Sequence, residues 1–121
     1  MRVVLVVEDE EDISDFLRYI LENENFRVKT AASLAEARAF LKEGLPDAVL
    51  LDRGLPDGDG LDICRELKGA GPKPSILVLS ARKDVAEVRE GLAAGADHYI
   101  TKPFQFMDVV SRLPPAPPPA H

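Results

Sequence analysis

Short, unbroken apolar runs are the feature of this sequence that most restricts its fold. Val3–Val7, Ala48–Leu51 and Ile76–Leu79 contain only aliphatic residues, and a polar residue follows each of them. A continuous apolar run of this length is typical of a strand that is buried on both faces, as in a parallel sheet. Val28–Ala32 is a weaker strand candidate, and Tyr99-Ile100 marks a short fifth strand.

The segments between these runs carry apolar residues at the spacing of amphipathic helices. The residues at helical spacing are Ile13, Phe16, Leu17, Ile20 and Leu21; Leu34, Ala37, Phe40 and Leu41; Leu61, Cys64 and Leu67; Val85, Val88 and Leu92; and Phe106, Val109, Val110 and Leu113. Ser33 and Glu36 have the spacing of a capping box at the start of the second helix. Strands and helices that alternate in this way predict an α/β domain with a doubly wound, five-stranded parallel sheet of the flavodoxin-like order. We expect five helices, and a short last one, because prolines stop it after about Leu113.

Length and charge narrow the class of protein further. The chain has 121 residues and a net charge of −6, which fits one globular domain over residues 1–113 and argues against direct nucleic-acid binding. Residues 114–121 (PPAPPPAH) are expected to form a Pro-rich tail or linker stub. A single cysteine, the absence of a long apolar run and the lack of room for a signal peptide predict a cytoplasmic protein without a membrane span.

Charged and hydroxyl side chains follow the predicted strands at the points where they end. Glu8 and Asp9 follow the first strand, Asp52 the third and Ser80 the fourth, and Lys102 follows the fifth. Because the carboxyl ends of parallel strands meet at one edge of a sheet, we expect these groups to lie together. Taken singly, each has an ordinary structural explanation, such as a turn former, an acid at a helix start or a solvated surface charge.

Together the five groups fit phosphoryl transfer to a carboxylate. Three carboxylates repel one another unless a cation joins them, and oxygen ligands favour Mg²⁺. Asp52 could act as the nucleophile that forms an acyl phosphate. Lys102, Ser80 and the backbone N–H of Ala81 could then neutralise the phosphoryl oxygens.

Four motifs, in order, resemble the receiver domains of response regulators in two-component signalling. They are VVEDE (Val6–Glu10), LLDRGLPDGDGLD (Leu50–Asp62), LVLSAR (Leu77–Arg82) and GADHYITKPF (Gly95–Phe104). The resemblance covers the chain from about Arg2 to Leu113 and is strongest to the branch that carries a winged-helix DNA-binding domain. It implies a phosphorylation-activated switch that catalyses only its own phosphotransfer and autodephosphorylation and is not an enzyme acting on an external substrate.

The resemblance also implies a role for particular residues. Asp52 would be the phosphoacceptor, with Ser80 and Lys102 as its catalytic partners and the Ala81 N–H on the phosphate. The Mg²⁺ ligands would be Asp9, Asp52, the main-chain carbonyl of Gly54, and Glu8 through a metal-bound water. Ser80 and Tyr99 would form the switch, and the Lys102–Pro103 peptide bond would be cis.

Partners follow from the same resemblance. The phosphoryl donor would be a sensor histidine kinase or a phosphotransfer protein, and the output would go to a downstream protein or to an effector domain absent from this sequence. The chain would be a monomer or a weak dimer through the fourth helix, fifth strand and fifth helix. Val88 and His98 stand where that branch commonly has charged residues, and the last helix is short, so this face departs from the pattern.

Two other functions use similar residues. A haloacid-dehalogenase-like phosphatase also has an Asp nucleophile and Mg²⁺, but the second Asp that it requires is replaced here by Gly54. A receiver-like adaptor that works without phosphorylation would not need the complete set of acids, hydroxyl and Lys.

Overall fold

The computed structural model describes residues 2–69 and 74–114. Apart from Pro114, the predicted Pro-rich tail lies outside the described residues. Within the described residues no helix has the length and apolar character that a membrane crossing requires.

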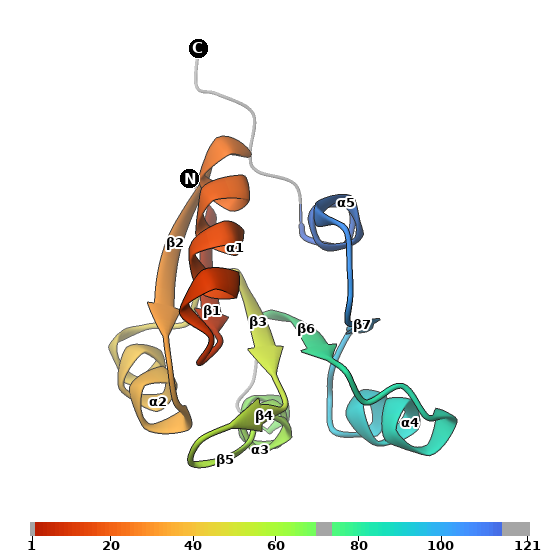
Figure 1. Ribbon diagram of the computed structural model, residues 1–121. Coiled ribbons are helices and arrows are strands. Elements are labelled where there is room, and N and C mark those ends of the chain that lie inside the picture. The colour runs from red at the N-terminus through yellow and green to blue at the C-terminus, as the bar shows by residue number, and fades with distance from the viewer. Residues whose placement is uncertain (1, 70–73, 115–121) are drawn as a thin grey trace.

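A five-stranded parallel sheet forms the centre of the molecule (Figure 1). Its strands are β1 (Arg2–Val7), β2 (Phe26–Ala31), β3 (Ala48–Asp52), β6 (Ser75–Ser80) and β7 (His98–Thr101). They lie in the order β2-β1-β3-β6-β7, which confirms the predicted doubly wound α/β fold. The direction of winding reverses between β1 and β3, and such a switch point is where open α/β sheets place their functional sites.

Five helices cover the two faces of the sheet. They are α1 (Glu11–Asn23), α2 (Leu34–Glu43), α3 (Leu61–Lys68), α4 (Val85–Ala93) and α5 (Phe106–Val110). Successive residues of each strand point to opposite faces, so Leu50 packs with α1 and α5 whereas Val49 and Leu51 pack with α2 and α3. Figure 1 separates the two groups, with α1 and α5 in its upper half and the other three helices in its lower half.

A small antiparallel hairpin, β4 (Gly54–Leu55) and β5 (Gly58–Asp59), follows the central strand β3 and was not predicted. Its turn residue Asp57 accepts hydrogen bonds from the backbone N–H groups of Leu34 (2.8 Å) and Ala35 (3.0 Å) at the start of α2. These bonds lower the pKa of Asp57. The predicted capping box is confirmed only in part: Ser33 Oγ accepts from the Glu36 N–H, but the Glu36 carboxylate accepts from the N–H of Ala32 and not of Ser33.

The spacing of Val85, Val88 and Leu92 predicts the helix α4 correctly, but Val85 and Leu92 do not lie on its buried side. Val85 is 67% exposed and Leu92 47% exposed, and Gly91 is the buried residue of the helix. The side of α4 that faces the domain packs against the ring of Tyr99 at Gly91. A Cβ built at Gly91 would lie only 2.5 Å from that ring, so a larger residue would not fit there.

Two aromatic residues that lie at helical spacing in the sequence are also exposed. Phe16 of α1 is 49% exposed and lies with Pro103 and Phe104 along an open groove, and Phe106 of α5 is 44% exposed. The last helix is shorter than expected. It ends at Val110, after which the N–H groups of residues 112 and 113 bond three residues back, a geometry too tight to continue an α-helix.

Candidate functional site

Three carboxylates meet at the switch point of the sheet. Glu8 and Asp9 directly follow β1, and Asp52 is the last residue of the neighbouring strand β3. One oxygen of each side chain lies within 4.8 Å of the others. Glu8 is 2% exposed and Asp52 8% exposed, whereas Asp9 is open to solvent. Two largely buried acids therefore face each other, with a third at the surface beside them.

Lys102 joins the two buried carboxylates. Its Nζ donates to Glu8 Oε1 at 3.1 Å and to Asp52 Oδ2 at 3.3 Å. Its backbone N–H donates to the carbonyl of Ser80 at 2.8 Å, which fixes the end of β7 against the end of β6. The peptide bond between Lys102 and Pro103 is cis.

The pKa values reflect this crowding of charge. Burial, followed by the hydrogen bond and charge of Asp52, raises the pKa of Glu8 to about 7, although the Glu10 N–H and Lys102 act to lower it. For Lys102, burial alone would lower the pKa, but the charge of Asp52 and the hydrogen bond to Glu8 offset burial and raise it. Burial and the negative charge of Asp52 therefore favour the protonated form of Glu8, and the bond from Lys102 offsets this only in part.

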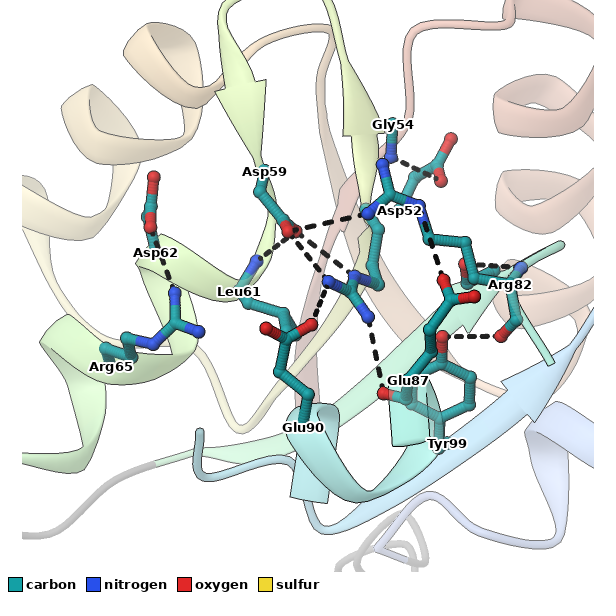
Figure 2. A network of polar contacts seen from close by, with 12 residues as sticks. Asp52, Gly54, Asp59, Leu61, Asp62, Arg65, Arg82, Glu87, Glu90 and Tyr99 are labelled. Atoms are coloured by element: carbon teal, nitrogen blue, oxygen red, sulfur yellow. Dashed lines mark hydrogen bonds and ion pairs between the residues drawn. The ribbon is translucent and has the colours of Figure 1, made fainter. Parts of the chain in front are cut away.

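A divalent cation fits this donor set. The oxygen-only ligands are the type that hard cations such as Mg²⁺ and Ca²⁺ prefer. Burial and the neighbouring Asp52 raise the pKa of Glu8, and a bound cation would offset both effects. The N–H of Gly54 donates to Asp52 Oδ1 at 3.1 Å and thereby holds the carboxylate in one orientation (Figure 2). A Cβ built at Gly54 would have no atom within 4 Å, so Gly54 is not packed against another part of the described chain.

Ser80 and Tyr99 lie in a second group of contacts. Ser80 is 2% exposed, and its Oγ accepts from the Arg82 N–H at 3.0 Å. Within the described part of the chain, no hydrogen bond joins Ser80 Oγ to the three carboxylates. The hydroxyl of Tyr99 donates to the backbone carbonyl of Arg82 at 2.6 Å, as Figure 2 shows. Ser80 and Tyr99 are thus linked through the backbone of one residue, Arg82. Ala81, which lies between Ser80 and Arg82 in the sequence, is exposed.

Sequence reasoning missed Arg53, the residue directly after Asp52. Its side chain is only 2% exposed, and its guanidinium bonds to Asp59 of β5 and to Glu90 of α4. The alternation of β3 could have revealed it: Val49 and Leu51 point to the face covered by α3, and Arg53 continues that series. An Arg in register with core residues is a signal of a buried charge with partners.

Sequence comparison finds relatives that are about twice as long as this chain and are described as regulatory proteins. The chain is 42% identical over 113 residues to the KDP operon transcriptional regulatory protein KdpE of Escherichia coli, covering 93% of this chain and 50% of KdpE. It is 40% identical over 110 residues to the response regulator MprA of Mycobacterium tuberculosis, covering 91% of this chain and 48% of MprA. The chain therefore spans about half the length of the curated relatives it matches.

Solved structures of the same fold include activated forms. The receiver domain of DrrB, described as BeF3 activated, has a TM-score of 0.82 and 34% identity, with 93% of each chain covered. A response regulator from Burkholderia pseudomallei, described as having a phosphorylated aspartic acid and a calcium ion, has a TM-score of 0.86 and 25% identity. The match covers 94% of this chain and 67% of that one.

A family model covers nearly the whole domain as well. The model for the response regulator receiver domain matches residues 4–114, a range that includes every group of the acidic site. Members of this family are phosphoacceptor signalling switches and are not conventional enzymes. The fold, the site at its switch point and this match together show that the chain belongs to the response regulator receiver domains.

Proposed function

We propose that Asp52 is the residue of this receiver domain that accepts the phosphoryl group. The observation that carries the proposal is the pair of buried carboxylates, Glu8 and Asp52, that share the ammonium group of Lys102 at the switch point. Asp52 is the acid of this group that ends the central strand, and the Gly54 N–H donates to one of its oxygens. The phosphorylated aspartic acid of the Burkholderia relative supports an aspartate as the acceptor.

The transfer step follows from the chemistry of the side chain. A carboxylate oxygen of Asp52 attacks phosphorus of a phosphohistidine, the new P–O bond forms and the P–N bond breaks. The bonding pair returns to the imidazole, which takes up a proton from water. Lys102 then lies beside the transferred group and donates to one of its oxygens, while Ser80 and the N–H of Ala81 serve another oxygen.

Mg²⁺ is the cofactor that we assign to the acids. Asp9, Asp52 and the carbonyl of Gly54 would bind it directly, and Glu8 would hold it through a water. When bound, the ion supplies charge neutralisation for the phosphoryl oxygens. Glu8 and Asp9 keep the position of the ion fixed relative to Asp52, because both follow the rigid strand β1.

The donor in this proposal is a histidine kinase or a phosphotransfer protein. Next to Lys102, an open groove is lined by Ile13, Phe16 and Phe104, which gives a protein donor an apolar surface beside the acceptor. Phosphorylation adds negative charge and strong acceptor oxygens, which draw Ser80 away from Arg82. Since Tyr99 bonds to the same residue, its position and the surface of α4 change with it.

Intact-mass measurement tests the proposal. With Mg²⁺ and acetyl phosphate, the native protein should gain the mass of one phosphoryl group, and Asp52→Asn should gain none. Asp62→Asn is the matched control, since Asp62 is an acid of α3 whose side chain bonds to Arg65 on the surface. The proposal fails if Asp52→Asn gains a phosphoryl group to the same extent as Asp62→Asn. It also fails if the native protein gains none.

A further inference from the structure

Arg53 makes the most extensive buried charged contact outside the acidic site. Its Nε and Nη2 donate to the two oxygens of Asp59 at 3.3 and 2.9 Å, and Nη2 also donates to Glu90 Oε1 at 2.5 Å. Its Nη1 donates to the backbone carbonyl of Glu87 at 3.3 Å. Burial alone would lower the pKa of Arg53, but the bonds to Asp59 and Glu90 raise it, so the guanidinium stays charged. One side chain therefore joins the β4–β5 hairpin to two points on α4.

The backbone of Arg53 is fixed as firmly as its side chain. Its carbonyl accepts from the N–H groups of Leu55 and Gly60, which folds the hairpin back against the end of β3. A Cβ at Gly60 would lie 2.2 Å from the carbonyl oxygen of Asp52, so this approach is possible only for glycine. Because Arg53 is bonded covalently to Asp52, any displacement of the acceptor strand end acts directly on the guanidinium.

Few buried apolar side chains hold α4 against the rest of the domain. Gly91 is the buried residue of the helix, and Val85 and Leu92 face solvent. The side chains of Asp59 and Glu90 point toward one central region in Figure 2, where the dashed lines meet. A helix with so little buried apolar area is held mainly by such polar contacts, and it can move when they are exchanged.

We infer that Arg53 is the positioning residue that couples the acceptor Asp52 to α4, through its shared bonds to Asp59 and Glu90. The coupling works in parallel with the path from Ser80 through Arg82 to Tyr99. The two paths converge, since the Arg82 guanidinium lies 3.9 Å from both Asp59 and Glu87. Exchange of the Glu90 carboxylate, which is 50% exposed, between Arg53 and water then lets α4 shift while Asp59 keeps Arg53 in place.

This inference rests on the proposed role of Asp52, and its test separates the two. Backbone amide NMR shifts are recorded as beryllofluoride, a phosphoryl analogue, is added with Mg²⁺ to the native protein and to variants. In the native protein the amides of Ser80 and Lys102 and those of α4 should all shift. In Arg53→Met the Ser80 and Lys102 shifts should persist, while the α4 shifts fall about twofold or more, because the link is lost. Arg53→Lys should give an intermediate response, since Lys keeps the charge but not the guanidinium fork.

Glu90→Gln and Glu66→Gln form the matched pair. Each removes one carboxylate charge from a residue about half exposed and bonded to an Arg, but the partner of Glu66 is the surface residue Arg38. Glu90→Gln should reduce the α4 response, and Glu66→Gln should leave it unchanged. This pair also decides the question if Arg53→Met does not fold.

The outcomes are distinguishable. If Ser80 and Lys102 do not respond in the native protein, the proposed acceptor site fails, and the coupling fails with it. If they respond but α4 does not, or if α4 responds equally in Arg53→Met, Glu90→Gln and Glu66→Gln, the acceptor site stands and the coupling through Arg53 is wrong.

Discussion

The acidic edge of the sheet and the helix α4 are built on different principles. Glu8 and Asp52 are attached to β1 and β3, whose residues from Val4 to Val7 and from Ala48 to Leu51 are at most 1% exposed. By contrast, Gly91 is the buried residue of α4, and the contacts of this helix with the domain include the ring of Tyr99, the bonds of Arg53 and a hydrogen bond from Lys68 to the Ala93 carbonyl. The chemical groups therefore stand on closely packed strands, whereas α4, the helix expected to report their state, has few buried apolar side chains.

This contrast has a physical purpose in a switch. Phosphoryl transfer requires groups held in fixed positions, which a close-packed core provides. A change of surface requires two arrangements of similar free energy, which a helix held by a few exchangeable polar bonds provides.

The largest expected effect compares one Leu from each region. Leu50→Ala removes a side chain that is 1% exposed and packs under α1, and it should lower the free energy of unfolding by about 2–5 kcal/mol. Leu92→Ala truncates a residue of α4 that is 47% exposed, and it should change the free energy of unfolding by roughly 0.5 kcal/mol or less. Urea denaturation measures both, and equal losses would remove the distinction between the two regions.

The second prediction concerns the electrostatic strain of the acidic edge without metal. The pKa of Glu8 in the folded protein is about 7, above its ordinary value of 4.5, so between these pH values the folded state binds more protons than the unfolded state. Stability should therefore fall as pH rises through this window, by on the order of 2 kcal/mol in chelator. Urea denaturation at pH 5 and pH 8 should show this loss in the native protein and little of it in Glu8→Gln. Similar pH dependence in both proteins would assign the effect to other groups.

The third prediction tests how tightly the chain after the β4–β5 hairpin packs against the end of β3. Gly60→Ala places a methyl group against the Asp52 carbonyl and should lower the free energy of unfolding by about 1–3 kcal/mol, because backbone has to move. Gly54→Ala, at the start of the hairpin that Gly60 follows, adds a methyl group into open space and should cost less. Denaturation midpoints compare the two, and an equal cost would mean that the hairpin is not fixed against β3.

The smallest effect is expected at the edge of the Arg53 contacts. Arg82 lies 3.9 Å from its carboxylate partners, and its side chain is 49% exposed. Arg82→Met should change the free energy of unfolding by roughly 0.5 kcal/mol or less. A loss much larger than this, measured in the same urea experiments, would show that α4 is held by its outer ion pairs and not by Arg53.

Sequence reasoning succeeded where one residue pattern determines the structure by itself. The short, β-branched apolar runs of β1, β3 and β6 are typical of buried strands, and parallel strands bring Glu8, Asp52 and Lys102 to one edge. The grouping of these residues could therefore be predicted from the sequence.

It failed where apolar spacing was not the deciding factor. Val85 and Leu92 have helical spacing, but the inner side of α4 is occupied by Tyr99, whose ring fits there because residue 91 is glycine. That packing joins residues from separate elements, so no local pattern contains it. The hairpin and the burial of Arg53 were missed for a related reason, since both depend on partners on other elements.

The distances along the chain between the site residues have a consequence for folding. Lys102 bonds to Asp52 across 50 residues and to Glu8 across 94. No local segment can form these contacts, and contacts of such long range form only when most of the chain has reached its native topology. Asp52, the proposed acceptor, should therefore become reactive only in a completely folded domain, and a partly folded or nascent chain should not respond to a phosphodonor.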